Sequence, residues 1–299
     1  MRVFITGASG FIGKAVTKEL LGAGHTVVGL ARSDRAAEEL VAVGADVKRG
    51  SLTDLNILRE GASASDGVIH LAFIHDFANY ERTCQTDREA IQAMGDVLAG
   101  SSRPLIITSG TMLLPHGRLG TEDDLFDSSS PTFAARGLSE ELTKGLASRG
   151  IRTVIMRLAP VNHGDGDNHM FISTLVATAR EKGVSIYVGD GLNCWPAVHC
   201  LDTAVAYRLA LEKATAGSTF HVVAEEVKMK DIAQTIGNKL GVPVQSKSIR
   251  ETQEHFGPFS LVVGADNPIS NQKTRQELDW NPQQRGLLAD LQDGEYFQV

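Results

Sequence analysis

The chain has 299 residues, of which 42% are hydrophobic and 22% are charged, and its formal net charge is −7. This composition excludes a fibrous or disordered protein, and the length is enough for one large domain or two unequal lobes. The acidic balance argues against nucleic acid or a membrane surface as a partner, since both usually require a basic face.

The first thirteen residues, MRVFITGASGFIG, predict a strand, a tight turn and the start of a helix that continues over 14–23. Glycines let a backbone approach a pyrophosphate closely, and the N–H groups at a helix N-terminus attract its charge. A turn without a ligand is the alternative, which the preceding strand argues against. We therefore predict a dinucleotide site that includes Gly7, Ser9, Gly10, Phe11, Ile12 and Gly13.

Strand patterns alternate with helix patterns along the first half of the chain. The expected strands lie at 3–6, 26–30, 46–48, 68–72, 105–108 and 153–157. This alternation predicts an α/β protein with a Rossmann-type, doubly wound parallel sheet.

The pattern changes after residue 160. Helices are expected at 170–182, 202–213, 228–240, 250–256, 272–278 and 285–293, and shorter strands at 184–188, 219–223 and 244–248. We predict a dinucleotide-binding domain over 1–160 and a smaller, mixed substrate lobe over 161–299, closely packed against it. Ligands bind at the carboxyl edge of such sheets, so a small-molecule substrate is expected between the lobes.

The residues after the second strand bear on the choice of cofactor. Enzymes that use NAD usually carry an acid there, whereas this chain has Arg32, Ser33 and Arg35. A guanidinium suits a 2′-phosphate, so we predict NADP(H). Asp34 leaves NAD open, and the two arginines could also be solvated loop charges.

The cysteines Cys84, Cys194 and Cys200 lack the spacing of a disulfide scaffold, which favours a reducing compartment, and we expect the cytoplasm. Cys194, His199 and Cys200 lack a fourth metal ligand. We therefore predict buried thiols and no metal site.

Several segments resemble, in order, the short-chain dehydrogenases/reductases, and within them an atypical subgroup of the extended, NAD-dependent epimerase/dehydratase branch. The segments are TGASGFIG (6–13), RGSLTD (49–54), DGVIHLAF (66–73), LIITSG (105–110), MRLAPVNHG (156–164), WPAVHCLDTA (195–204) and LDWNP (278–282). The resemblance implies further cofactor contacts at Ser51 and Leu52 for the adenine, Leu71, Ala72 and Phe73 for the ribose and pyrophosphate, and Pro160 and Val161 for the nicotinamide.

The chain departs from this family at the catalytic motif Tyr-x-x-x-Lys. The matching helix has Arg136 at the lysine position and Thr132 at the tyrosine position, and no register of the segment supplies a phenol. The resemblance implies that Arg136 holds the nicotinamide ribose. Threonine is a poor proton donor, so the ordinary mechanism is absent or displaced.

Other groups could take the catalytic roles. Gly110 stands where a catalytic Ser or Thr is expected, which leaves Ser109 and Thr111 to polarise a substrate oxygen. Asp87 replaces an asparagine of ordinary members and could be an acid or base, or could cap a helix.

For the missing proton donor, Tyr80 is the best-placed tyrosine and Tyr187 the second. His75 and His163 follow strands, and His163 could also transfer protons, whereas His199 better fits a structural role. His75, Met112, His163, Phe171 and Trp195 are expected at the substrate pocket, although the apolar ones could equally be core residues.

These features predict an NADP(H)-dependent oxidoreductase for a small to medium apolar carbonyl compound or alcohol, with a nonstandard proton donor. One alternative is a redox-neutral isomerase, epimerase or cyclase that keeps its nucleotide bound. Another is a regulatory protein that senses NADP(H). A homodimer could form through the helices at 87–98 and 132–149.

Overall fold

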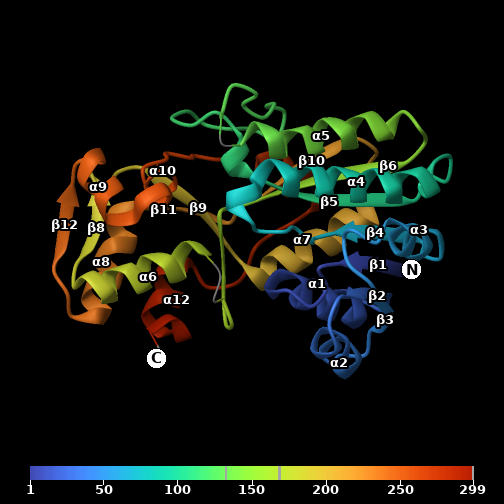
Figure 1. The fold of residues 1–299 in the computed structure, drawn as a ribbon, viewed down its shortest axis with the longest axis horizontal. Helices are drawn as coiled ribbons and strands as arrows, with labels where there is room; N and C mark the ends of the chain where they lie inside the picture. Colours follow the sequence, from blue (N-terminus) through green and yellow to red (C-terminus); the bar gives the residue numbers. More distant parts are fainter. Residues whose placement is uncertain (132, 168–169, 298–299) are drawn as a thin grey trace.

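The computed structural model describes residues 1–131, 133–167 and 170–297. Its larger lobe is built on seven parallel strands in the order β10-β6-β5-β4-β1-β2-β3 (Figure 1). They are β1 (Arg2–Thr6), β2 (Thr26–Ala31), β3 (Asp46–Arg49), β4 (Gly67–His70), β5 (Pro104–Gly110), β6 (Arg152–Leu158) and β10 (Ser218–Val222). The strand order reverses beside β1, at the position where such sheets bind their ligands.

Helices cover both faces of this sheet, which explains why its strands are apolar on both sides. One face packs against α1 (Phe11–Gly22), α2 (Asp34–Ala42) and α7 (Cys200–Lys213). The other packs against α3 (Leu55–Ser63), α4 (Tyr80–Leu98) and α5 (Ala134–Ala147) (Figure 1). The predicted Rossmann-type α/β fold is confirmed.

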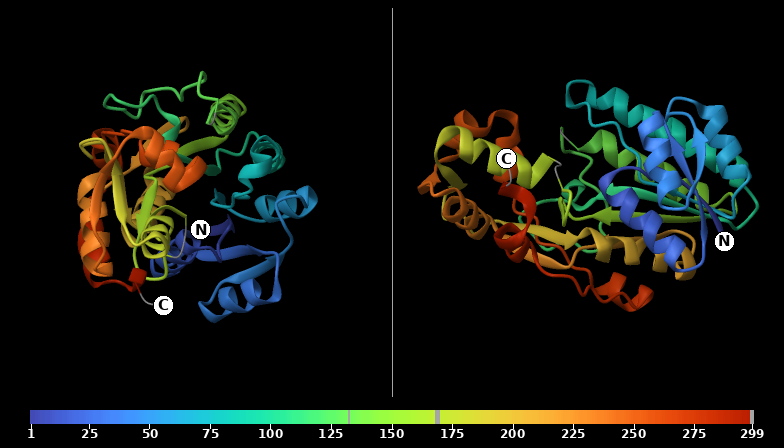
Figure 2. Two further views of the ribbon diagram at one scale, coloured as in Figure 1. Left: turned by 60° about the vertical axis from the view of Figure 1, so that its left-hand side comes forward. Right: turned by 90° about the horizontal axis from the view of Figure 1, so that it is seen from below.

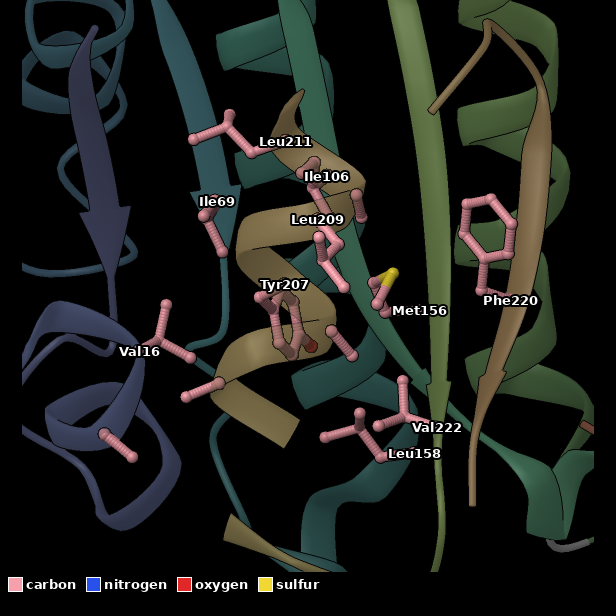
Figure 3. Close-up of a cluster of buried hydrophobic side chains, with 14 of the residues drawn as sticks. Val16, Ile69, Ile106, Met156, Leu158, Tyr207, Leu209, Leu211, Phe220 and Val222 are labelled. Carbon is pink, nitrogen blue, oxygen red and sulfur yellow. The ribbon is translucent and has the colours of Figure 1, made fainter. Parts of the chain in front are cut away.

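The core beneath α7 joins segments from the two halves of the sequence. Figure 3 shows Tyr207 of α7 among Met156, Leu158 and other apolar side chains of the sheet. Tyr207 is completely buried, and its hydroxyl forms a 2.6 Å hydrogen bond with Thr108 Oγ1. Because α7 and β10 follow residue 160 yet belong to the larger lobe, the chain crosses between the lobes more than once, whereas the sequence predicted one boundary.

The smaller lobe has a mixed three-stranded sheet and a parallel pair of strands (Figure 2). The sheet contains β7 (Val161–His163), β9 (Cys194–His199) and β11 (Glu225–Lys228), and the pair is β8 (Ser185–Val188) with β12 (Val244–Lys247). The helices of its core region are α6 (Met170–Lys182), α8 (Met229–Leu240), α9 (Ile249–Phe256), α10 (Ser260–Val263) and α12 (Leu287–Asp293). By contrast, α11 (Gln272–Leu278) packs on α7 and β10 of the larger lobe.

Several boundaries differ from the expected ones. Helix α1 begins at Phe11, directly after the glycine turn, and α4 begins at Tyr80, seven residues before the helix expected at 87–98. The strand expected at 68–72 ends at His70. Strands β7 and β11, of three and four residues, were not predicted. Within the described chain, every helix is too short or too polar to cross a bilayer.

Candidate functional site

The carboxyl ends of the parallel strands bring most predicted cofactor residues to one edge of the sheet. The glycine turn follows β1, Arg32 follows β2, Ser51 follows β3 and Leu71 follows β4. Because neighbouring strands are parallel and in register, residues far apart in sequence become neighbours here.

The glycine turn has no room for side chains. Gly7 has φ +74°, and a Cβ added there would lie 2.8 Å from the Ala72 nitrogen. A Cβ on Gly13 would lie 1.9 Å from the Gly7 carbonyl oxygen. Helix α1 starts after Gly10 without a side-chain cap from the described residues, and a helix N-terminus attracts an anion. The turn therefore fits a dinucleotide pyrophosphate.

The loop after β4 is fastened to this turn. Backbone N–H groups of Leu71 and Ala72 donate to the Thr6 carbonyl and hydroxyl oxygens at 3.1 and 3.3 Å. Phe73 continues the same half-buried loop. Ser9 lies in the turn itself, and Phe11 and Ile12 open α1. The predicted cofactor residues of the glycine turn and of the loop after β4 therefore lie together where these two segments meet.

At the end of β2, Arg32 is exposed and forms no ion pair with any residue that the structure describes. Ser33 instead caps α2, its hydroxyl accepting from the Ala36 N–H at 3.2 Å. Arg35 pairs with Glu39 at 3.0 Å on the same helix. Among the described residues at the end of β2 and the start of α2, which we call the β2–α2 corner, Arg32 is therefore the arginine whose charge is not paired with a carboxylate.

After β3, Ser51 is occupied within its own turn. Its N–H and hydroxyl donate to the Asp54 carboxylate at 2.7 and 2.8 Å, which lowers the pKa of Asp54. Leu52 is buried. The position that the family resemblance assigns to the adenine thus offers backbone and an apolar side chain, with the hydroxyl already bonded.

Arg136 of α5 is almost fully buried and is held by three groups. Its Nη2 donates to the Thr108 carbonyl oxygen at 2.6 Å, and its Nη1 pairs with the Asp87 carboxylate. Its guanidinium carbon lies 4.3 Å from the centre of the Phe73 ring. The charge is therefore fixed beside the loop after β4. Thr132, the other position matched to the catalytic motif, lies outside the described residues.

His70, the last residue of β4, joins this arrangement to the glycine turn and was not among the predicted site residues. His70 Nδ1 lies 2.6 Å from Thr6 Oγ1, and Nε2 lies 3.2 Å from Asp87 Oδ1. The Ser139 hydroxyl also donates to Asp87, at 2.7 Å. The segment DGVIHLAF contains the histidine, but only the pairing of β4 with β1 shows what it contacts.

Asp87 is ionised at neutral pH. Burial alone would raise the pKa of Asp87, but the Arg136 charge and the hydrogen bond with His70 lower it to about 2. Such a carboxylate has no proton to donate. Asp87 therefore fits a role in holding Arg136 better than the acid role considered from the sequence.

The two candidate hydroxyls beside Gly110 both bond to protein groups. Ser109 donates to Glu140 at 2.6 Å, and Glu140 is itself paired with buried Arg157. Thr111 is completely buried and donates to Asn267 at 3.0 Å. At Gly110 a Cβ would meet nothing nearer than a carbonyl oxygen at 3.9 Å. Gly110, which has no hydroxyl, is thus the position with free space around it, whereas the hydroxyls of Ser109 and Thr111 are already hydrogen-bonded.

Tyr80 begins α4 within an aromatic group formed with Phe73, His75 and Phe77. Its ring stacks on Phe77 at 5.9 Å and meets Phe73 edge-on at 6.2 Å, and Phe73 also meets His75 edge-on at 5.3 Å. Burial and neighbouring Cys84 raise the pKa of Tyr80, while Arg136 acts to lower it. Tyr80 is therefore a protonated phenol close to a fixed cation.

The histidines of the smaller lobe form a separate cluster. His163 is buried, and its Nδ1 lies 2.5 Å from Asp290, which Arg285 also contacts. His199 caps α7, its Nδ1 accepting from the Leu201 N–H at 3.2 Å. The structural role expected for His199 agrees with this cap, and His163 is enclosed by its partners.

The predicted pocket residues of apolar type divide between core and partly exposed positions. Trp195 is completely buried, and its Nε1 donates to the Val262 carbonyl at 3.2 Å, so Trp195 is core and the substrate contact expected there is corrected. Phe171 is half-buried against Trp195, at 5.6 Å. Met112 is buried. Of the two residues that the family resemblance assigns to the nicotinamide, Val161 is buried and Pro160 is half-buried.

Comparisons with known proteins agree with this fold. The model of the NAD dependent epimerase/dehydratase family matches residues 3–224. An uncharacterized protein of Schizosaccharomyces pombe is 48% identical over 299 residues, with 99% of this chain and 100% of that protein covered. An uncharacterized protein of Saccharomyces cerevisiae is 46% identical over 294 residues, with 97% and 98% covered.

More distant relatives have names that state an activity. A 2-alkyl-3-oxoalkanoate reductase of Stenotrophomonas maltophilia is 26% identical over 266 residues, with 83% of this chain and 78% of that protein covered. Among solved structures, a dTDP-glucose 4,6-dehydratase of Streptomyces venezuelae has a TM-score of 0.79 at 20% identity, with 100% of this chain and 97% of that chain covered. That likeness concerns the fold.

Proposed function

Because the chain belongs to the NAD dependent epimerase/dehydratase family, we propose that it is an NADP(H)-dependent oxidoreductase for apolar carbonyl compounds or alcohols. The choice of cofactor is supported by the glycine turn after β1 together with Arg32 after β2, which has no ion pair among the described residues. A helix N-terminus suits the pyrophosphate, and a guanidinium suits a 2′-phosphate bidentately.

The dinucleotide, when bound, supplies the hydride. Gly7, Gly10 and Gly13 let the backbone approach its pyrophosphate, and Arg32 contacts the phosphate that distinguishes NADP(H) from NAD(H). Phe73 lies in the loop after β4, next to the glycine turn, and the guanidinium of Arg136 packs against the Phe73 ring. We assign Arg136 the role of an electrophilic contact to the substrate oxygen or nicotinamide ribose, because its charge is fixed by Asp87 and Thr108.

The aromatic group favours an apolar substrate. Phe77 is 60% exposed and Ile74 is 38% exposed in the same loop, beside half-buried Phe73 and Tyr80. Exposed apolar side chains of this density are typical of a ligand-binding surface. The relative from Stenotrophomonas maltophilia, named for reducing an alkyl-substituted oxoalkanoate, supports the same class of substrate.

We assign the proton donor role to Tyr80. A phenol with a raised pKa stays protonated at neutral pH, and it is still a much stronger acid than the alcohol formed from a ketone. Arg136 stabilises the phenolate that remains after transfer. Asp87 is ionised and has no proton to donate, and His163 is enclosed in the smaller lobe, so we assign the proton donor role to neither.

The test measures NADPH and NADH binding to the purified protein and then follows nicotinamide absorbance with pooled 3-oxoalkanoate esters, cyclic ketones, aldehydes and enones. We expect NADPH to bind more tightly and to be consumed. Binding without consumption by any pool would favour the redox-neutral enzyme or the sensor, and absence of binding would contradict the cofactor assignment.

Tyr80→Phe tests the proton donor. With an active substrate, kcat should fall by about 10²- to 10⁴-fold while the dissociation constant for NADPH is unchanged, since only the hydroxyl is removed. Tyr187→Phe is the matched control, a half-buried tyrosine of β8 in the smaller lobe, and it should keep kcat. Full activity of Tyr80→Phe would assign the proton to another group or to water.

A further inference from the structure

The position of Asp34 bears on the choice between NADP(H) and NAD(H). It is the first residue of α2, two residues after Arg32, and its side chain is 92% exposed. A free carboxylate here would repel a 2′-phosphate and could accept a hydrogen bond from the 2′-hydroxyl of NADH. Whatever restrains Asp34 therefore influences which dinucleotide the corner accepts.

Arg49, the last residue of β3, provides such a restraint. Its Cα is paired in register with Ala31, the last residue of β2, so its side chain starts at the edge where Arg32 emerges. Nη2 pairs with Asp34 Oδ1 at 2.5 Å, and Nη1 donates to the Ser33 carbonyl oxygen at 2.5 Å. The two branches of one guanidinium thus hold the carboxylate and the backbone that precedes it.

The other acidic side chain that contacts this corner is matched in the same way. Glu39 of α2 pairs with Lys14 of α1 and with Arg35, both at 3.0 Å. With Asp34 held by Arg49, Arg32 is left beside the end of β2 without an ion pair to any described residue. This pattern favours an additional anion at the corner.

We propose that Arg49 is a positioning residue that selects NADP(H) over NAD(H) by holding the Asp34 carboxylate away from the adenosine ribose. This inference rests on the proposed function, because it concerns the same dinucleotide site. Arginine suits the role because its planar fork spans a carboxylate and a carbonyl at once, whereas a lysine ammonium lacks that fork.

The experiment measures the dissociation constants of NADPH and NADH for the full-length wild type, Arg49→Ala and the double variant Arg49→Ala/Asp34→Asn. Arg49→Ala frees Asp34, so NADPH should bind more weakly and NADH more tightly, and the preference should fall by about tenfold. Adding Asp34→Asn removes the carboxylate and should abolish the gain in NADH affinity. Arg49 is half exposed at a strand end, and thermal unfolding checks that each variant folds.

Two controls separate a local effect from a general loss of positive charge. Arg59→Ala removes a half-buried arginine of α3 whose Nη1 bonds to Asn56, and it should leave the preference unchanged. Arg49→Lys should retain part of the preference, because an ammonium can still pair with Asp34.

The outcomes distinguish this inference from the function on which it rests. A wild type that prefers NADH would overturn the NADP(H) assignment, and this inference with it. A wild type that prefers NADPH, with a preference unchanged in Arg49→Ala, would overturn the role of Arg49 alone. The same conclusion would follow if the double variant kept the gain in NADH affinity, since the carboxylate would then not be its source.

Discussion

At the scale of single residues, the main feature is a charged pair in which Arg136 stands at the family's lysine position and Asp87 at its asparagine position. Asp87 and Arg136 come from α4 and α5 and pair directly, with His70 and Ser139 as further partners of the carboxylate. Unlike lysine, an arginine does not release a proton in a protein. Arg136 therefore supplies a fixed positive charge, and any proton must come from another group.

Asp87→Asn should lower the free energy of unfolding by about 3 kcal/mol, because it leaves the buried Arg136 charge without its partner. Urea unfolding at neutral pH measures this. Asp96→Asn is the control on the same helix: Asp96 pairs with Arg149 at 2.9 Å with both side chains about 40% exposed, and its loss should cost less than about 1 kcal/mol. Equal effects of the two variants would show that Arg136 does not depend on Asp87.

At the scale of elements, strand β1, the glycine turn and α1 form one unit with the loop after β4. The close packing of this unit depends on glycines without side chains, since Gly7 contacts the Ala72 backbone and Gly13 contacts Gly7. A second junction fastens the segment after β5 to the C-terminal part of the chain. Asn267 donates to the Thr111 carbonyl at 3.2 Å, accepts from its hydroxyl, and donates its N–H to the Cys194 carbonyl at 3.0 Å.

Gly13→Ala should weaken NADPH binding by at least about tenfold, because the added methyl group would force the turn away from the position that admits a pyrophosphate. Isothermal titration measures the affinity. Gly22→Ala lies in the same helix with no atom within 4 Å of the added Cβ, and it should leave binding unchanged and raise stability by up to about 1 kcal/mol. Unchanged affinity in Gly13→Ala would contradict a pyrophosphate at this turn.

At the scale of the whole molecule, a buried polar group joins α5 to the strands at one edge of the sheet and to the C-terminal segment. Arg157 of β6 pairs with Glu140 at 2.6 Å, and its Nη1 lies 3.3 Å from His221 Nε2. His221 of β10 also contacts the Ser270 carbonyl through Nδ1 at 2.8 Å. These partners assign the Nδ1–H tautomer, with Nε2 accepting from Arg157.

Stability should therefore depend on pH between about 6.5 and 4. Burial lowers the pKa of His221 from 6.5 to about 4, and a second proton would face the Arg157 guanidinium. The unfolded chain binds this proton more readily, so the contribution of neutral His221 is complete above pH 6.5 and is lost as the pH falls towards 4. Urea unfolding should show a loss of about 2 kcal/mol between pH 7 and pH 5 from this group.

The His221 contribution is isolated by comparing two variants. His221→Gln should reduce the difference between pH 7 and pH 5, whereas His116→Gln, which changes an exposed histidine, should leave it as in the wild type. An unaltered pH difference in His221→Gln would assign the acid sensitivity to other groups.

The sequence by itself determined the fold class and the position of the glycine turn. Both depend on short-range patterns: alternation along strands, helical periodicity between them, and glycines at a fixed offset from β1. The order of the motifs placed Arg32, Ser51 and Leu71 after successive strands, and parallel strands then bring their ends to one edge. Local chemistry was sufficient for these conclusions.

Only the tertiary structure decided which partners the polar side chains have. Thr111 and Asn267 are 156 positions apart, His163 and Asp290 are 127 apart, and Arg49 meets Asp34 because β2 and β3 pair in register. No local pattern encodes such contacts, since they depend on which elements pack together. For the same reason Trp195 could not be assigned to core or pocket until the smaller lobe enclosed it.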